Sequence, residues 1–157
     1  MRRVVTGPAT GGGADIVLDG DPPTVVEFGQ YRTTELWVTD SSPPVVGVTA
    51  DSSTRPWALE PPPGGSCFRV VRIAPEAESA GPPVQEDEDP GFLAEHSTET
   101  LDYVVVVSGR VTLTVGDSEV TLGPGDTVVQ QGTPHDWRNR GTEPCVLVGV
   151  LISTREP

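Results

Sequence analysis

The feature that most constrains this chain is a dense series of short apolar runs between residues 101 and 153. Each run has the length of a β-strand, and Gly, Pro or Asp separates it from the next. In the run RVTLTVG, the apolar side chains of Val111, Leu113 and Val115 alternate with threonines, which is the period of a half-buried strand. Strands at this spacing, without any long helical period, predict a β-sandwich or a closed barrel.

Two segments before residue 101 predict further strands. SCFRVVRIAP, residues 66–75, is a convincing strand whose alternation places Arg69 and Arg72 on opposite faces. One of these two arginines would therefore point toward the interior if the strand lines a barrel. VVEFGQYRTTELWVTD, residues 25–40, contains the same kind of alternation and predicts one or two strands.

The length of 157 residues favours one domain. We expect N-terminal strands and loops in residues 1–65 and the barrel core in residues 66–153. Residues 76–95 are acidic and interrupted by Pro and Gly, so we expect a loop there, either purely structural or lying over the mouth of the barrel.

The chain is strongly acidic and contains no lysine. Ten basic residues, all arginine, oppose 23 carboxylates, and the formal charge is −13. Phosphate backbones and anionic lipids repel such a chain, which argues against nucleic acids and membranes as partners. The absence of lysine excludes Schiff-base chemistry through a lysine side chain.

Other sequence features bear on the compartment. There is no run long enough to span a membrane and no hydrophobic signal core, so we expect a cytoplasmic protein. Cys67 and Cys145 each border an apolar run, and we expect buried free thiols, although their spacing leaves a disulfide open.

Both histidines of the chain fall in two short motifs of its C-terminal half. The first motif contains His96, Thr98, Asp102 and Gly109. The second contains Gly125, Asp126, Gly132, Pro134, His135 and Asn139. These motifs resemble those of the cupin superfamily, with Thr98 where a second histidine is usual and Asp102 in place of a glutamate. The resemblance implies a small single-domain cupin, an all-β protein with a jelly-roll barrel, also described as a double-stranded β-helix.

The two motifs predict a site inside the barrel. Alternate side chains of an extended segment share a face, so His96 and Asp102 point the same way, as do His135 and Trp137. Closing the barrel brings His135 opposite His96 and Asp102. The resemblance implies that these three residues hold one divalent metal, and two imidazoles with a carboxylate suit Fe, Zn, Mn, Ni or Co. The alternative is a metal-free polar pocket in which the histidines hydrogen-bond Asp102 and move protons.

Four side chains are candidates for contact with a substrate: Arg69, Thr98, Gln130 and Trp137. Arg69 would anchor a substrate carboxylate if it lies on the inner face. Trp137 is either an aromatic contact or a packing residue at the rim. Asp126 is expected to cap its own turn, and Asn139 to fix a strand end through bonds to the backbone.

We therefore expect an enzyme that acts on a small organic molecule, with His96, Asp102 and His135 as catalytic residues. Non-redox lyase, isomerase or cyclase chemistry on a polar carbonyl or carboxylate compound is preferred, as in a tailoring step of secondary metabolism. The alternatives are an Fe(II)-dependent dioxygenase and a non-catalytic small-molecule-binding protein.

A homodimer is also expected. The outward side chains of the strand at residues 101–109, which include Tyr103, Val105 and Val107, need cover. A monomer covered by its own N-terminal half is the alternative.

Overall fold

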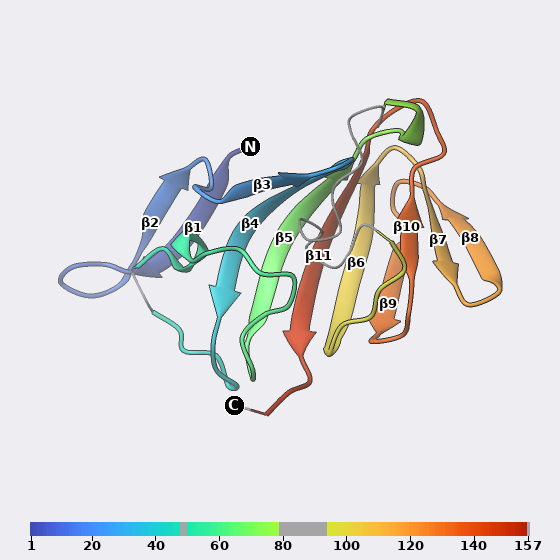
Figure 1. Cartoon of the computed structure of the whole chain (residues 1–157). Helices are drawn as coiled ribbons and strands as arrows, with labels where there is room; N and C mark the ends of the chain where they lie inside the picture. Colours follow the sequence, from blue (N-terminus) through green and yellow to red (C-terminus); the bar gives the residue numbers. More distant parts are fainter. Residues whose placement is uncertain (48–49, 79–93, 157) are drawn as a thin grey trace.

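The computed structural model describes residues 1–47, 50–78 and 94–156, and nearly all of its regular structure is β (Figure 1). Most of the acidic segment expected to lie over the barrel mouth falls in residues 79–93, outside the described residues. Within the described ranges, no helix is both long and apolar enough to cross a membrane.

The strands form three antiparallel sheets, which Figure 1 shows side by side. The first is a hairpin of β1 (Arg3–Pro8) and β2 (Ala14–Gly20). The large sheet runs in the order β3 (Val25–Phe28), β4 (Tyr31–Thr39), β5 (Ser66–Ile73), β11 (Cys145–Ser153), β6 (Thr100–Ser108) and β9 (Thr127–Gln131). The small sheet runs in the order β10 (Asp136–Arg138), β7 (Val111–Val115) and β8 (Ser118–Leu122). Two short 3-10 helices are η1 (Ser52–Thr54) and η2 (Glu76–Glu78).

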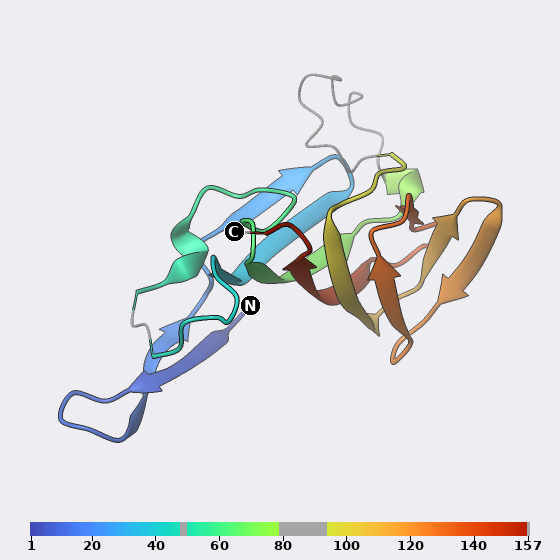
Figure 2. The ribbon, with the colours of Figure 1, turned by 90° about the horizontal axis from the view of Figure 1, so that it is seen from below.

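The small sheet lies beside the β6 and β9 end of the large sheet, as the view from below shows (Figure 2). A hydrogen bond of 2.7 Å from the Tyr31 hydroxyl on β4 to the Trp137 carbonyl on β10 joins the two sheets. Between them lies a buried core of apolar side chains: Tyr31, Ile73, Val106, Val111, Leu113, Leu122, Cys145 and Leu147. The predicted all-β fold with a jelly-roll barrel is confirmed.

The register of the large sheet separates an inner row from an outer row. The inner row consists of residues directly opposite one another on five strands: Glu35, Arg69, Gly149, Val104 and Val128. The outer row consists of Phe68, Val150, Tyr103 and Val129. Because successive side chains of a strand point to opposite faces, the inner row faces the barrel interior and the outer row faces away from it.

Several local predictions are confirmed. Arg69 is buried on the inner face of β5, whereas Arg72 is exposed. Both cysteines are free and buried. Asp126 accepts a hydrogen bond of 2.8 Å from the Gly123 amide and so caps its own turn. The strands β3 and β4, which precede residue 66, belong to the same sheet as β5 and therefore build part of the barrel wall.

Asn139 acts as expected. Its side-chain amide donates to the carbonyls of Ile73 and Glu143, each at 2.9 Å. This fully buried side chain ties the end of β10 to the end of β5.

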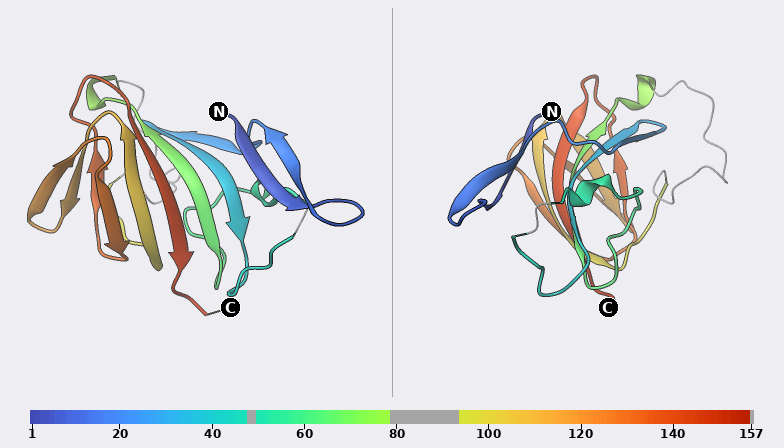
Figure 3. Two further views of the ribbon diagram at one scale, coloured as in Figure 1. Left: turned by 180° about the vertical axis from the view of Figure 1, so that it is seen from behind. Right: turned by 90° about the vertical axis from the view of Figure 1, so that its left-hand side faces the viewer.

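The β1–β2 hairpin, which the sequence analysis did not identify, extends from the body of the molecule (Figure 3). A two-stranded hairpin alone is marginally stable in water, so its attachment matters. Arg3 provides that attachment because its guanidinium donates to the Asp51 carboxylate and to the Leu36 carbonyl, both at 2.9 Å. Hydrogen bonding by Arg3 is the main reason that the pKa of Asp51 falls to about 2.

Replacing Asp51 by Asn should loosen the hairpin and cost about 1.5–3 kcal/mol, the range for hydrogen bonds to charged groups. Because the pKa of Asp51 is depressed by folding, its contribution is complete above about pH 4 and is lost as the pH falls toward about 2. Hydrogen exchange of the β1 and β2 amides measures the effect. Asp19→Asn, which removes an exposed carboxylate of the same hairpin, is the control. Unchanged exchange in Asp51→Asn would show that another contact holds the hairpin.

Candidate functional site

The two histidines are paired through their backbones. The amide of His96 donates to the His135 carbonyl at 3.0 Å, and the amide of His135 donates to the His96 carbonyl at 2.9 Å. Residues that exchange both hydrogen bonds in an antiparallel pair stand directly opposite each other, with their side chains on one face. The two imidazole centroids are accordingly 4.5 Å apart.

Each imidazole is held through Nδ1. His96 Nδ1 lies 3.0 Å from the Ala94 carbonyl, and His135 Nδ1 lies 2.8 Å from the Thr133 carbonyl. A carbonyl oxygen only accepts hydrogen bonds, so Nδ1 carries the proton in both rings and Nε2 is the unprotonated nitrogen of the neutral form. Burial is the main cause that lowers the pKa of each histidine.

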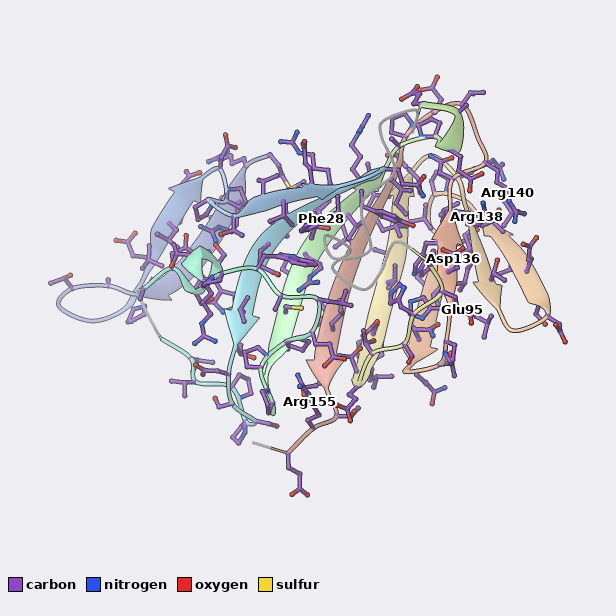
Figure 4. All side chains as sticks on the ribbon, in the orientation of Figure 1. Phe28, Glu95, Asp136, Arg138, Arg140 and Arg155 are labelled. Carbon is purple, nitrogen blue, oxygen red and sulfur yellow. The ribbon has the colours of Figure 1, made fainter. Side chains whose placement is uncertain are left out.

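Two carboxylates flank the histidine pair. Asp136 and Glu95, labelled in Figure 4, each adjoin one of the histidines in sequence. Their negative charges raise the pKa of His135 and so oppose the effect of its burial. The pair therefore lies between an apolar interior and an acidic surface.

The pair borders a cavity of about 100 Å³ inside the barrel. Its wall is mostly apolar or aromatic and is contributed mainly by the large sheet, with Trp137 from the small sheet. The lining residues are Tyr31, Thr33, Trp57, Leu59, Arg69, Val71, His96, Thr98, Asp102, Val104, His135, Trp137, Leu147, Gly149 and Leu151. Six of the seven sequence-predicted site residues thus share one cavity.

Gln130, the seventh, lies behind His135 and does not line the cavity. Its side-chain nitrogen donates to the Thr133 carbonyl at 2.8 Å and to the Thr133 hydroxyl at 2.6 Å, and it is 3.1 Å from His135 Nδ1. Gln130 therefore holds the loop whose carbonyl orients the imidazole. This placement makes it a positioning residue, in contrast to the substrate contact that its sequence position had indicated.

Asp102 is a polar group of the cavity whose carboxylate is only partly satisfied, and Arg69 Nε likewise has no hydrogen-bond partner among the described residues. Asp102 is 7% exposed, and its Oδ1 atom has no hydrogen-bond partner among the described residues. Burial raises the pKa of this carboxyl, while a hydrogen bond from Thr100 and the charge of Arg69 act in the opposite direction. Thr98 bonds its hydroxyl to that of Thr100 at 2.7 Å.

Arg69 lines the cavity but is already paired. Its guanidinium is 2.9 Å from the Glu35 carboxylate, and both side chains are 5% exposed. It also donates to the carbonyls of Leu59 at 2.9 Å and Ala58 at 3.2 Å, and it lies 5.5 Å from the Trp57 ring centroid.

Two residues in contact with Arg69, Glu35 and Trp57, were not predicted from the sequence. Burial raises the pKa of Glu35, and the charge of Arg69 opposes that effect. The sequence does contain an indication for Glu35. It is separated by two and four residues from Thr33 and Tyr31 on one predicted strand, so all three side chains point to the same face, the one toward the core. No comparable signal marked Trp57, which lies in an irregular segment before β5.

The three candidate ligands, His96, Asp102 and His135, are only partly arranged as a metal site. Two adjacent imidazoles with Nδ1 held by carbonyls are arranged as metal-ligating histidines usually are. Among the described residues, however, no group of three or more His, Cys, Asp or Glu side chains is placed to hold an ion. Asp102 shares the cavity with the histidines without joining them in such a group.

Comparison with known proteins gives a consistent result. The family model described as "Cupin domain" matches residues 70–151. Phomopsin biosynthesis cluster protein C' of Diaporthe leptostromiformis is 34% identical over 125 residues, which cover 75% of this chain and 58% of that protein. The cupin-domain-containing oxidoreductase fogC of Aspergillus ruber is 32% identical over 97 residues, covering 59% of this chain and 40% of that protein. The chain therefore spans less than two thirds of the length of these relatives.

A solved structure supports the fold alone. The Cupin 2 conserved barrel domain protein from Salinispora arenicola CNS-205 superposes with a TM-score of 0.50 at 16% identity, covering 83% of this chain and 82% of that chain.

The imidazole tautomers can be checked directly because the chain has only two histidines. At about pH 8, where both rings are neutral, nitrogen NMR of labelled protein should show Nδ1–H and unprotonated Nε2 in each ring. Gln130→Leu should shift His135 toward a mixture of tautomers, since it frees the Thr133 loop, whereas the exposed Glu99→Gln should change neither ring. A wild-type His135 protonated at Nε2 would contradict the assignment.

Proposed function

The chain belongs to the cupin family, and we propose that it is an enzyme that transforms a small organic molecule in its barrel cavity by proton transfer. The observation that carries the proposal is the histidine pair on the wall of a mostly apolar cavity, with the unprotonated nitrogen of His135 defined by its Nδ1 contact. The proposed reaction class is isomerisation, elimination or cyclisation of a carbonyl compound.

His135 is the proposed base. Its Nε2 accepts a proton from a carbon next to the substrate carbonyl, and the electron pair of that C–H bond moves into the resulting enolate. The imidazolium then returns the proton to another atom of the same molecule, so an isomerisation of this kind needs no external reactant. The backbone pairing with His96 and the Gln130-supported loop keep the ring in place during both transfers.

The relatives favour a tailoring step in secondary metabolism, since the phomopsin protein is named for a biosynthesis cluster. Two relatives are named cupin-domain-containing oxidoreductases, which favours iron-dependent dioxygenation as a second candidate reaction. A non-catalytic binding protein would use the same cavity without turnover.

Filling the cavity should abolish ligand binding without unfolding the chain. Gly149 lines the cavity, and a Cβ atom there would meet Val104 and Leu151 at ordinary contact distances of 3.6 and 3.7 Å. In a screen of ring-sized fragments by ligand-observed NMR, Gly149→Ala should retain the hits and Gly149→Leu should weaken them at least about 10-fold. Overpacking costs about 1–3 kcal/mol, so thermal unfolding must show that Gly149→Leu is folded. Equal binding by a folded Gly149→Leu variant would place the ligand elsewhere.

We further propose that His96 and His135 can hold one divalent metal, with Asp102 as the third ligand after a side-chain rearrangement. The ordered Nδ1 contacts of both histidines support this candidate. Such an ion would supply Lewis-acid polarisation of a carbonyl or, in the case of iron, activation of dioxygen.

Metal analysis of protein purified without chelators tests this candidate. The wild type should carry one divalent ion per chain, and His135→Ala should lose most of it because one of only two imidazole ligands is removed. Glu99→Gln, which changes an exposed carboxylate outside the cavity, should keep the wild-type content. Equal metal content in His135→Ala and the wild type would eliminate this site.

We also propose a homodimer through the outer row of the large sheet. Phe68 on β5, Tyr103 on β6 and Val129 on β9 are 39%, 49% and 56% exposed and belong to one row on the same face, with Val150 of β11 between the first two. An exposed apolar face of this kind usually marks an interface. Since each copy carries a charge of −13, this row, which contains no carboxylate, is a place where two copies can approach closely.

Sedimentation equilibrium should give twice the chain mass of 16.5 kDa for the wild type. Tyr103→Glu should give the monomer mass because it buries a carboxylate in the interface. Val120→Glu is the matched control, since Val120 is also 49% exposed but lies on β8 of the small sheet. A monomeric wild type would refute the dimer.

A further inference from the structure

The cavity wall carries a polar group that a ligand can satisfy. Asp102 is more than nine-tenths buried, lines the cavity, and leaves Oδ1 without a hydrogen-bond partner among the described residues. A buried polar atom without a partner is costly, and native structures normally provide one. Because a carboxylate oxygen accepts hydrogen bonds, the missing partner is an O–H or N–H donor.

The charge around the cavity disfavours an anionic ligand. Arg69 is neutralised by Glu35 at 2.9 Å and is held by backbone carbonyls. Glu35 and Asp102 together contribute two carboxylates against this one guanidinium, so the local formal charge is −1. A carboxylate ligand would meet this negative charge in a buried site, where charge repulsion is strong. The buried pairing of Arg69 therefore argues against the substrate carboxylate that its position on the inner face had indicated.

The shape and lining favour a flat ring. The chain has only eight Phe, Trp and Tyr residues, yet Tyr31, Trp57 and Trp137 line this cavity together with both imidazoles. Tyr31 comes from the large sheet and Trp137 from the small sheet, so aromatic groups reach the cavity from two sides. A volume of about 100 Å³ limits the ligand to no more than one ring, because a larger core cavity of about 150 Å³ is known to bind benzene.

We infer that the cavity takes a neutral, planar ring bearing a hydroxyl or amino donor, and that Asp102 Oδ1 accepts the hydrogen bond from that group. This inference rests on the proposed function, because it names the ligand class of the same cavity. It assigns Asp102 a recognition role that does not depend on a metal. It assigns Arg69 the role of a positioning residue that pairs with Glu35 behind the cavity wall and lies against Trp57 in that wall.

Four matched probes test the inference by calorimetric titration: 4-methylphenol, 4-methylanisole, 4-methylcyclohexanol and benzoate. The first carries a flat ring and a donor, the second lacks the donor, the third lacks the flat ring, and the last is an anion. We expect 4-methylphenol to bind about 10- to 100-fold more tightly than 4-methylanisole, the range for a hydrogen bond to a charged group. It should also bind more tightly than 4-methylcyclohexanol, which lacks the flat ring, and than benzoate, which the negative local charge repels.

Variants of Asp102 then test whether this residue accepts the hydrogen bond from the ligand. Asp102→Leu, which is close in size, should bind 4-methylphenol and 4-methylanisole equally, whereas Asp102→Asn keeps an acceptor oxygen and should retain part of the preference. Glu99→Gln should behave as the wild type. If Asp102→Leu fails to fold, the wild-type comparison of phenol with anisole and the Asp102→Asn titration still decide the question.

The outcomes separate this inference from the proposed function. Tighter binding of benzoate, or equal binding of the anisole or the cyclohexanol, would overturn the inference while leaving the cavity as a binding site. A phenol preference that persists in a folded Asp102→Leu variant would also overturn it. If none of the probes binds at millimolar concentration and the fragment screen with Gly149→Leu also shows no cavity ligand, both the inference and the proposed function fail.

Discussion

The backbone pairing of His96 with His135 is the contact on which the candidate site depends. It lies outside the named strands and joins the segment that leads into β6 of the large sheet to the segment that leads into β10 of the small sheet. The same two hydrogen bonds therefore connect the sheets and place the two imidazoles next to each other, with ring centroids 4.5 Å apart. The Tyr31–Trp137 bond makes a second connection between the sheets, and the cavity lies between the two connections.

The mostly apolar barrel interior contains charged side chains at a few positions where an interior built only for stability would be apolar. The Glu35–Arg69 pair is desolvated, and replacing such pairs by apolar residues is often neutral or stabilising. Asp102 leaves a buried oxygen without a described partner, which costs folding free energy. The apolar core and the strand ladders compensate for these groups. Departures of this kind from the most stable arrangement are typical of functional sites.

The local structure of the barrel was largely predictable because successive side chains of a strand point to opposite faces, so the sequence shows which residues share a face. Alternation placed Arg69 on one face of β5 and His135 on the same face as Trp137, as the structure has them. The β1–β2 hairpin was missed because its glycine-rich loop and short apolar runs resemble irregular structure. Gln130 was placed near the site, but its orientation behind His135 follows from the fold of the Thr133 loop, which has no periodic signal.

The sequence by itself determined the strand series, the all-β class, the division of each main strand into two faces and the presence of both histidines near one barrel interior. These properties depend on a period of two residues and on turn-forming residues, which are local. Only the tertiary structure decided that Glu35 neutralises Arg69, that Asp102 does not join the histidine pair in one group of ligands, and that Gly149 lines the cavity. Those relations depend on register across strands distant along the chain, where a shift of one residue would turn every side chain to the other face.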